Sequence, residues 1–134
     1  MSNIAEIEGI GPASAEKLEA IGIKTVEGLL EKGASKDGRE EIAAASGASE
    51  ADVATWVKHA DLMRVKGVGP QFSELLQAAG VDSVLELAER NAENLAAKLD
   101  EVNAEKNLTN RVPNAEALAE MIEFAKGLPR VITH

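Results

Sequence analysis

The side chains that could support catalysis or metal binding are few and unfavourably spaced. His59 is the only internal histidine, and Asp61, two residues later, falls on a different face of a helix, so no general base with an orienting partner is formed. We expect the His59 imidazole to be partly exposed beside a backbone carbonyl. Glu101 and Glu105 share a helical face, but further carboxylates or a histidine at matching spacing are missing. The sequence therefore predicts no enzymatic activity, no cofactor and no metal site.

Two turns of the same composition offer backbone groups instead of reactive side chains. They are Gly9-Ile10-Gly11-Pro12 and Gly67-Val68-Gly69-Pro70. In each turn we expect the first glycine to be left-handed at a helix end, the second to be the N-cap of the next helix, and the proline to take its first position. The apolar residue between the glycines should be buried between the two helices. Dinucleotide binding is excluded, because the third glycine of that loop is absent and no strand-like run precedes either turn.

The two turns belong to an internal repeat. The same offset of 58 residues continues beyond them, pairing Leu18 with Leu76, Gly22 with Gly80, Ile23 with Val81, Val26 with Val84 and Leu29 with Leu87. A duplicated unit usually buries its apolar face against its twin. The sequence thus predicts an all-α fold of tandem helix-hairpin-helix units, packed as one compact domain about an approximate two-fold axis. The domain covers residues 1–134, with repeat one at about 3–57 and repeat two at about 58–130.

Helices are predicted over nearly the whole chain, separated by glycines and capping residues. The predicted ranges are 3–8, 12–21, 25–32, 37–46, 49–64, 70–79, 83–89, 91–103 and a last helix capped by Asn114. Trp56 lies in one apolar stripe with Val53 and Val57, which predicts a buried tryptophan. The closing helices pair at an offset seven residues larger than the turns do. We therefore expect an insertion within 100–113, and the pattern does not decide the structure of 104–113.

The composition limits the possible classes of function. The chain has 134 residues, which is enough to bury a hydrophobic core without disulfide or metal cross-links. It contains no cysteine, which excludes disulfides and thiolate metal sites. No apolar run is long enough to span a bilayer and no signal-peptide pattern opens the chain, so we expect a cytoplasmic protein without membrane association. Trp56, Phe72 and Phe124 are the only aromatic residues, which leaves almost no stacking surface for unpaired bases.

Three stretches carry a resemblance to a known family: VKHADLMRVKGVGP, LLQAAGVDSVLELAERNAENLAAKLDEVNAEKNL and RVPNAEALAEMIEFAK. Over essentially its whole length the chain resembles a bacterial domain-of-unknown-function family, number 4332, of the helix-hairpin-helix superfamily. That resemblance implies a pair of hairpins whose backbone amides hold nucleic-acid phosphates, sometimes with a monovalent cation bound by hairpin carbonyls. Carried over by position, these contacts fall on Gly9, Ile10 and Gly11 and on Gly67, Val68 and Gly69.

The two turns differ in the charges that surround them. Glu6, Glu8, Glu16 and Glu19 surround the first turn, with only Lys17 nearby, whereas Lys58, Arg64 and Lys66 lie near the second. The chain carries a net charge of −9, and phosphate binding depends on neutralisation by lysine and arginine. If one turn binds nucleic acid, we expect the second turn to do so.

Two functions from different classes follow. The first is weak, sequence-independent binding of duplex DNA through the second turn, with Arg64, Lys66, Gly67, Val68, Gly69 and Gln71 as the site. In that case Gly9, Ile10, Gly11, Pro12 and Pro70 are structural. The second is an acidic, all-helical interaction or scaffold domain that docks an unidentified protein, for example through small-residue helices such as Leu95-Ala96-Ala97. In that case both turns merely connect packed helices.

Overall fold

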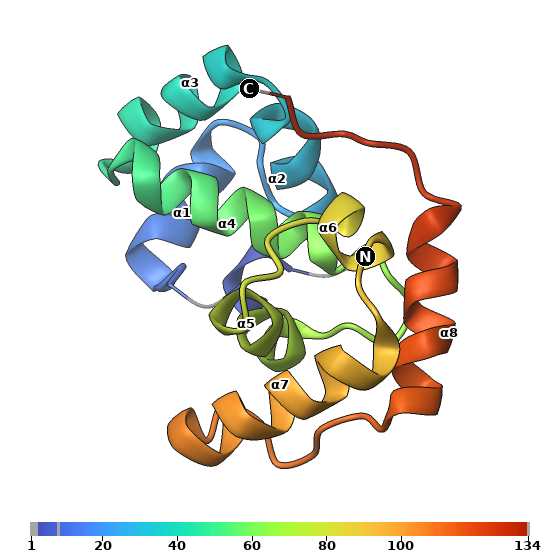
Figure 1. The fold of residues 1–134 in the computed structure, drawn as a ribbon. Helices are drawn as coiled ribbons and strands as arrows, with labels where there is room; N and C mark the ends of the chain where they lie inside the picture. The colour runs from blue at the N-terminus through green and yellow to red at the C-terminus, as the bar shows by residue number, and fades with distance from the viewer. Residues whose placement is uncertain (1–2, 8, 134) are drawn as a thin grey trace. The chain divides into compact units, whose positions relative to one another are not determined.

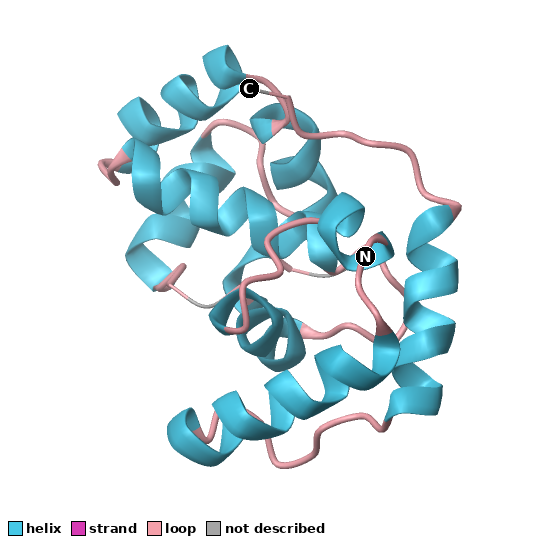
Figure 2. Cartoon of the chain, viewed as in Figure 1, coloured by secondary structure: helices cyan, strands magenta, loops and turns pink. Residues whose placement is uncertain are grey.

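The computed structural model describes residues 3–7 and 9–133. These residues form a 3-10 helix, η1 (Ile4–Glu6), and the α-helices α1 (Pro12–Ala20), α2 (Val26–Gly33), α3 (Lys36–Ser46), α4 (Glu50–Leu62), α5 (Pro70–Ala78), α6 (Val84–Ala88), α7 (Ala92–Lys106) and α8 (Ala115–Lys126) (Figures 1 and 2). Among the described residues the only β-pairing is an isolated bridge between Asn3 and Thr25, so the predicted all-α class is confirmed. No helix in this part of the chain is long and apolar enough to cross a membrane.

Capping side chains set most of the helix starts. The residues Thr25, Ser35, Ser83, Asn91 and Asn114 each accept a hydrogen bond from the backbone N–H three residues later. Such a bond satisfies one of the N–H groups that the first helical turn leaves without a partner. Because these signals are local, most predicted ranges agree with the observed helices within one or two residues.

Three predicted helix ranges need correction. The range 3–8 contains only the single turn of η1, and Glu8 lies outside the described residues. The helix predicted at 49–64 ends at Leu62, because Arg64 already belongs to the following turn. The helix predicted at 91–103 continues to Lys106, so the undecided stretch begins as helix.

The chain divides into two compact units. Unit 1 comprises Met1–Asp61 and Val131–His134, and unit 2 comprises Leu62–Arg130. Unit 2 is therefore inserted, in sequence, between two parts of unit 1. In unit 1, α3 packs against α1 and α2, and η1 packs against α1. In unit 2, α8 packs against α6 and α7, and α5 packs against α7. That the units share one core around a two-fold axis stays a prediction.

The repeated apolar residues are buried in both units. The pairs Leu18 and Leu76, Ile23 and Val81, Val26 and Val84, and Leu29 and Leu87 are all buried. Trp56 is 4% exposed, so its predicted burial is confirmed. The equal burial of matched positions shows that the sequence repeat corresponds to a repeat of local packing.

The extra residues of the second repeat lie within the range predicted for the insertion. Helices α3 and α7 end at left-handed C-caps, Gly47 (φ 75°) and Asn107 (φ 50°), which are 60 residues apart. The next helices are capped by Ser49 and Asn114, which are 65 residues apart. Helix α7 has 15 residues where α3 has 11. Against the offset of 58 at the turns, α7 thus ends two residues late, and the loop after it takes five further residues.

One side chain holds this longer loop against α7. The Asn103 Oδ1 accepts hydrogen bonds from the N–H groups of Leu108 and Thr109, at 2.9 and 3.0 Å. The Asn103 Nδ2 donates to the Thr109 carbonyl at 3.0 Å. The side chain therefore supplies partners that a regular secondary structure would otherwise provide.

Candidate nucleic-acid interface

The turn of unit 2 has the backbone geometry that its sequence predicts. Gly67 has a φ of 94°, a left-handed value that side chains other than hydrogen rarely allow. The Val68 N–H donates to the Val65 carbonyl at 3.0 Å, and the Val68 side chain is buried. Gly69 is the extended N-cap of α5, and Pro70 occupies the first helical position. The turn is thus rigid, and its apolar residue is part of the core.

The turn of unit 1 repeats this arrangement. Gly9 also has a φ of 94°, and the Ile10 N–H donates to the Ile7 carbonyl at 3.1 Å. Gly11 is the extended N-cap of α1, and Pro12 takes its first position. The left-handed first glycine, the N-cap glycine, the buried apolar residue and the first-position proline are therefore confirmed in each turn. The expectation that the first glycine lies at a helix end is wrong, because η1 ends at Glu6 and α4 ends at Leu62, several residues before Gly9 and Gly67.

A large side chain from the closing helix of each unit lies against the first glycine of the turn. A Cβ built on Gly9 would lie 3.1 Å from the Trp56 Nε1, and one built on Gly67 would lie 3.0 Å from the Met121 Cε. Trp56 on α4 and Met121 on α8 occupy equivalent positions of the two repeats, at the offset of the closing helices, which is seven residues larger than that of the turns. Both glycines are thus required by their dihedral angle, and at Gly9 the Trp56 indole adds a close neighbour that cannot easily shift.

Backbone donors gather where the second turn meets α5. The N–H groups of Gly67, Gly69 and Gln71 donate no hydrogen bond within residues 3–7 and 9–133. Gly69 offers no side-chain cap, and no heavy atom lies within 4 Å of a Cβ built on it. An uncapped helix start with open backbone amides attracts anions, because the helix dipole adds to the N–H groups.

The cationic side chains near this turn have different surroundings. Lys66 is exposed in the turn, directly before Gly67, and Gln71 is exposed in the first turn of α5. Arg64 is half-buried, and its Nη2 donates to the Pro129 carbonyl at 2.9 Å. Sequence reasoning missed this bond, because nothing local connects residues 65 positions apart. The turn thus presents one exposed lysine, and the nearby arginine is held against the residues after α8.

The only internal histidine is placed differently from the prediction. His59 is 4% exposed and Asp61 is also buried, so the expectation of a partly exposed imidazole is wrong. Burial lowers the pKa of His59, because the charged form loses its hydration. Polar and ionisable groups are rarely this buried, yet the sequence pattern alone did not distinguish them from surface residues.

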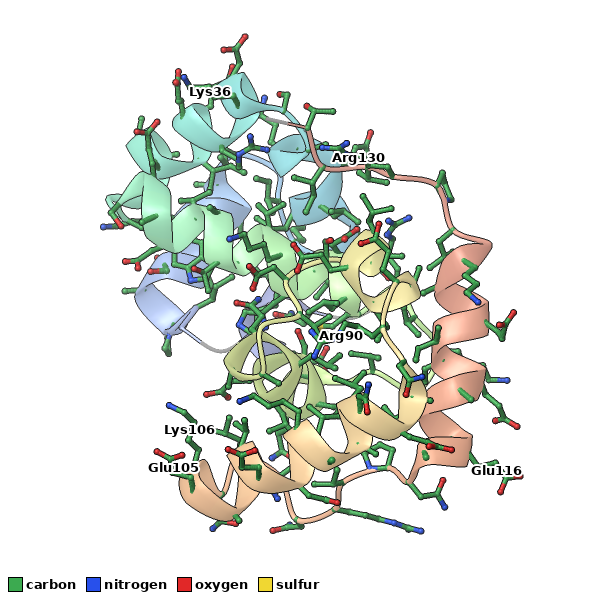
Figure 3. The ribbon with its side chains drawn as sticks, in the orientation of Figure 1. Lys36, Arg90, Glu105, Lys106, Glu116 and Arg130 are labelled. Atoms are coloured by element: carbon green, nitrogen blue, oxygen red, sulfur yellow. The ribbon has the colours of Figure 1, made fainter. Side chains whose placement is uncertain are left out.

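The carboxylates considered for a metal are on the surface. Glu101 and Glu105 are exposed on α7, and Figure 3 shows Glu105 and Lys106 extending outward from the end of that helix. Within the described part of the chain, no group of three or more histidine, cysteine, aspartate or glutamate side chains is positioned to hold a metal ion. Glu101 and Glu105 are therefore surface carboxylates of α7.

The described residues thus form an all-helical fold with two turns of matching geometry. Residues 8–128 match the family described as Domain of unknown function (DUF4332). The match covers most of the chain, and the protein is a member of this family. The family membership expected from the three sequence stretches is thus confirmed. No curated protein and no solved structure matches the chain.

Proposed function

We propose that the protein is a non-enzymatic, duplicated helix-hairpin-helix module that binds duplex DNA weakly and without regard to sequence through the turn of unit 2. The observation that carries the proposal is the meeting of three elements at the start of α5. These are the exposed Lys66, the open N–H groups of Gly67, Gly69 and Gln71, and the uncapped helix start. Phosphate oxygens accept hydrogen bonds from such amides and are attracted by the lysine and the helix dipole.

The lack of side chains at the two glycines supports backbone recognition. Gly69 has an open environment, so a phosphate meets no Cβ as it approaches the N–H groups. The Val68 side chain is buried in the hydrophobic core and so holds the turn in place, but it is not available to contact a ligand. Contacts of this kind position a duplex but carry no base information, which is why we propose binding without sequence preference.

The turn of unit 1 provides a natural contrast. It has the same backbone and the same uncapped proline-started helix, but Glu6, Glu16 and Glu19 are exposed around it. Glu8, which lies outside the described residues, matches Lys66 in the repeat. Negative charges at this density repel a phosphate backbone. We therefore assign DNA binding to the second turn alone.

Fluorescence anisotropy with a labelled duplex tests this proposal. With Lys66 as the one exposed cation of the turn and Arg64 beside it, the logarithm of affinity should fall with the logarithm of salt at a slope of about −1 to −2. Lys66→Glu should abolish binding, and Glu8→Lys should strengthen it. Lys106→Glu, the same charge change at the exposed end of α7, is the matched control and should retain most of the affinity.

Two outcomes would contradict the proposal. Equal weakening by Lys66→Glu and Lys106→Glu would mean that binding follows net charge and not the turn. Absence of binding to duplex, branched and single-stranded nucleic acid at ~20 mM salt, where screening is weakest, would exclude a nucleic-acid role.

A specific observation favours protein docking as the second candidate function. Leu85 on α6 and Phe124 on α8 are 50% and 44% exposed, and these two helices pack against each other. Exposed large apolar side chains are enriched where proteins associate. By contrast, Leu95 is fully buried, so the segment Leu95-Ala96-Ala97 offers little to a partner. If docking is the function, Phe124→Ser should abolish capture of a partner that Lys66→Glu still retains.

A further inference from the structure

The last described residues of the chain are bound to unit 1. The Thr133 N–H donates to the Ala34 carbonyl at 2.7 Å, and the Thr133 Oγ1 donates to the same oxygen at 3.1 Å. The Arg39 Nη2 donates to the Thr133 carbonyl at 2.6 Å. Val131 and Ile132, which precede Thr133, are half-buried. One residue at the end of the chain is therefore held through both its backbone N–H and its carbonyl.

Arg39 also bonds to the C-terminal end of α2. Its Nη1 donates to the carbonyls of Gly33 and Ala34, at 2.8 and 3.0 Å, which are the last residue and the C-cap of α2. A cation at a helix C-terminus satisfies carbonyls that lack partners and interacts favourably with the helix dipole. One guanidinium thus joins the end of α2 to the C-terminal segment.

The attachment of this segment differs in kind from the packing of the helices. The bonds from Arg39 Nη2 and Thr133 Oγ1 are exposed, and Thr133 itself is exposed. None of Val131, Ile132 and Thr133 is fully buried, and segments attached through solvent-exposed hydrogen bonds open at lower free energy than the fold as a whole. Detachment therefore need not disturb the buried residues of either unit.

We propose that Val131–Thr133 form a releasable strap, closed when Arg39 holds Thr133 against the end of α2. In the open state Thr133 is detached from Ala34 and from the Arg39 Nη2, while the Arg39 Nη1 stays on the Gly33 and Ala34 carbonyls. The latch is the pair of contacts at Thr133, because the backbone N–H and carbonyl of this one residue bond to Ala34 and Arg39. The proposal does not depend on nucleic-acid binding.

Nuclear magnetic resonance of the full ¹⁵N-labelled chain tests the strap. The heteronuclear NOE of Val131–Thr133 and the exchange rate of the Thr133 amide are compared in the wild type, Arg39→Gln and Lys36→Gln. Lys36 is exposed on the same helix (Figure 3), so Lys36→Gln removes the same charge without touching the strap. We expect Arg39→Gln to raise the Thr133 exchange rate about tenfold or more and to lower the NOE, and Lys36→Gln to leave both unchanged.

A second variant separates the strap from the cap of α2. Thr133→Pro removes the N–H that donates to Ala34 and leaves Arg39 intact, so it should lower the NOE of Val131 and Ile132 while the α2 and α3 resonances stay in place. Fluorescence of Trp56, which belongs to unit 1, reports whether that unit remains folded in each variant. A wild-type segment already as mobile as a free tail would overturn the proposal. An NOE unchanged in both Arg39→Gln and Thr133→Pro would do the same.

Discussion

Helices α4 and α8 close their units at matched positions, but they bury different chemistry beside the same apolar stripe. The stripe pairs Val53 with Leu118, Val57 with Ile122 and Ala60 with Ala125, all of them buried. At the position just before Ala60 and Ala125, α4 buries His59 while α8 leaves Phe124 44% exposed. The apolar stripe is therefore the part of these two helices that both repeats keep buried. The neighbouring positions are not fixed by the repeat, and the two units differ there in both residue type and burial.

The two turns show the same separation between backbone and charge. Glycine and proline set nearly identical dihedral angles in both. The flanking side chains, such as Glu6 in unit 1 and Lys66 in unit 2, are exposed and carry opposite charges. Exposed positions tolerate such changes because they contribute little to stability. The two repeats thus keep the same turn geometry, while the charge around the turn is negative in one repeat and positive in the other.

The largest expected effect concerns the side chains that lie against the turn glycines. Trp56→Ala should lower the free energy of unfolding by about 3–5 kcal/mol, as for other buried large aromatics. Met121→Ala should cost less, about 1–2 kcal/mol, because Met121 is only partly buried and its thioether is flexible. Urea unfolding followed by circular dichroism measures both. Equal costs would show that the two units depend on these contacts to the same degree.

The next effect compares the two glycines within each turn. Gly9→Ala and Gly67→Ala should each cost about 1–3 kcal/mol, because alanine is strained at positive φ. Gly9→Ala should be the more costly, since the rigid indole of Trp56 cannot move aside as the Met121 terminus can. Gly11→Ala and Gly69→Ala are the controls, with extended backbones and open surroundings. They should change stability by less than about 0.5 kcal/mol.

A pH-dependent effect should distinguish α4 from α8. Burial lowers the pKa of His59, while an unfolded histidine titrates near 6.5. The unfolded chain therefore takes up the proton first, and the stability is fully present above about pH 6.5 and falls as the pH decreases below it.

The measurement is urea unfolding at about pH 7.5 and about pH 5.5, which brackets the histidine titration. His59→Gln should reduce the loss of stability at the lower pH. Phe124→Gln, the same product residue at the matched position of α8, should keep the wild-type pH dependence. An identical pH response in the wild type and His59→Gln would contradict the assignment to His59.

The smallest effect is expected for the charges at the turns. Lys66→Glu and Glu8→Lys exchange the charges of the two repeats and should each change the free energy of unfolding by less than about 0.5 kcal/mol. The same variants are expected to change DNA affinity in opposite directions. A stability change above about 1 kcal/mol in Lys66→Glu would mean that this charge supports the fold. A loss of DNA binding in that variant could then result from its lower stability and would not identify Lys66 as a DNA contact.

Local signals account for the parts of the structure that the sequence predicted well. The turns and the helix starts at residues such as Ser83 and Asn114 depend on residues within a few positions of one another, whereas the place of the insertion followed from the change of offset between the two repeats. Dihedral preferences and capping bonds act at that range. The burial of Trp56 also followed from a pattern confined to one helix.

Contacts between residues distant in sequence were not predictable in this way. The bonds from Arg64 to Pro129 and from Arg39 to Thr133 join residues 65 and 94 positions apart, and no local pattern marks either partner. The burial of His59 was missed for a similar reason, because periodicity places a residue on a helical face but does not tell which faces become covered.

The sequence by itself determined the helices, the two rigid turns and the repeat, because glycine, proline and capping residues act through the backbone next to them. Only the tertiary structure decided that one turn glycine contacts an indole and the other a thioether, and that a histidine on α4 is buried. It also decided that the C-terminal residues bind to unit 1. These features depend on which surfaces meet when the helices pack, and that is settled by the combined shape of many side chains.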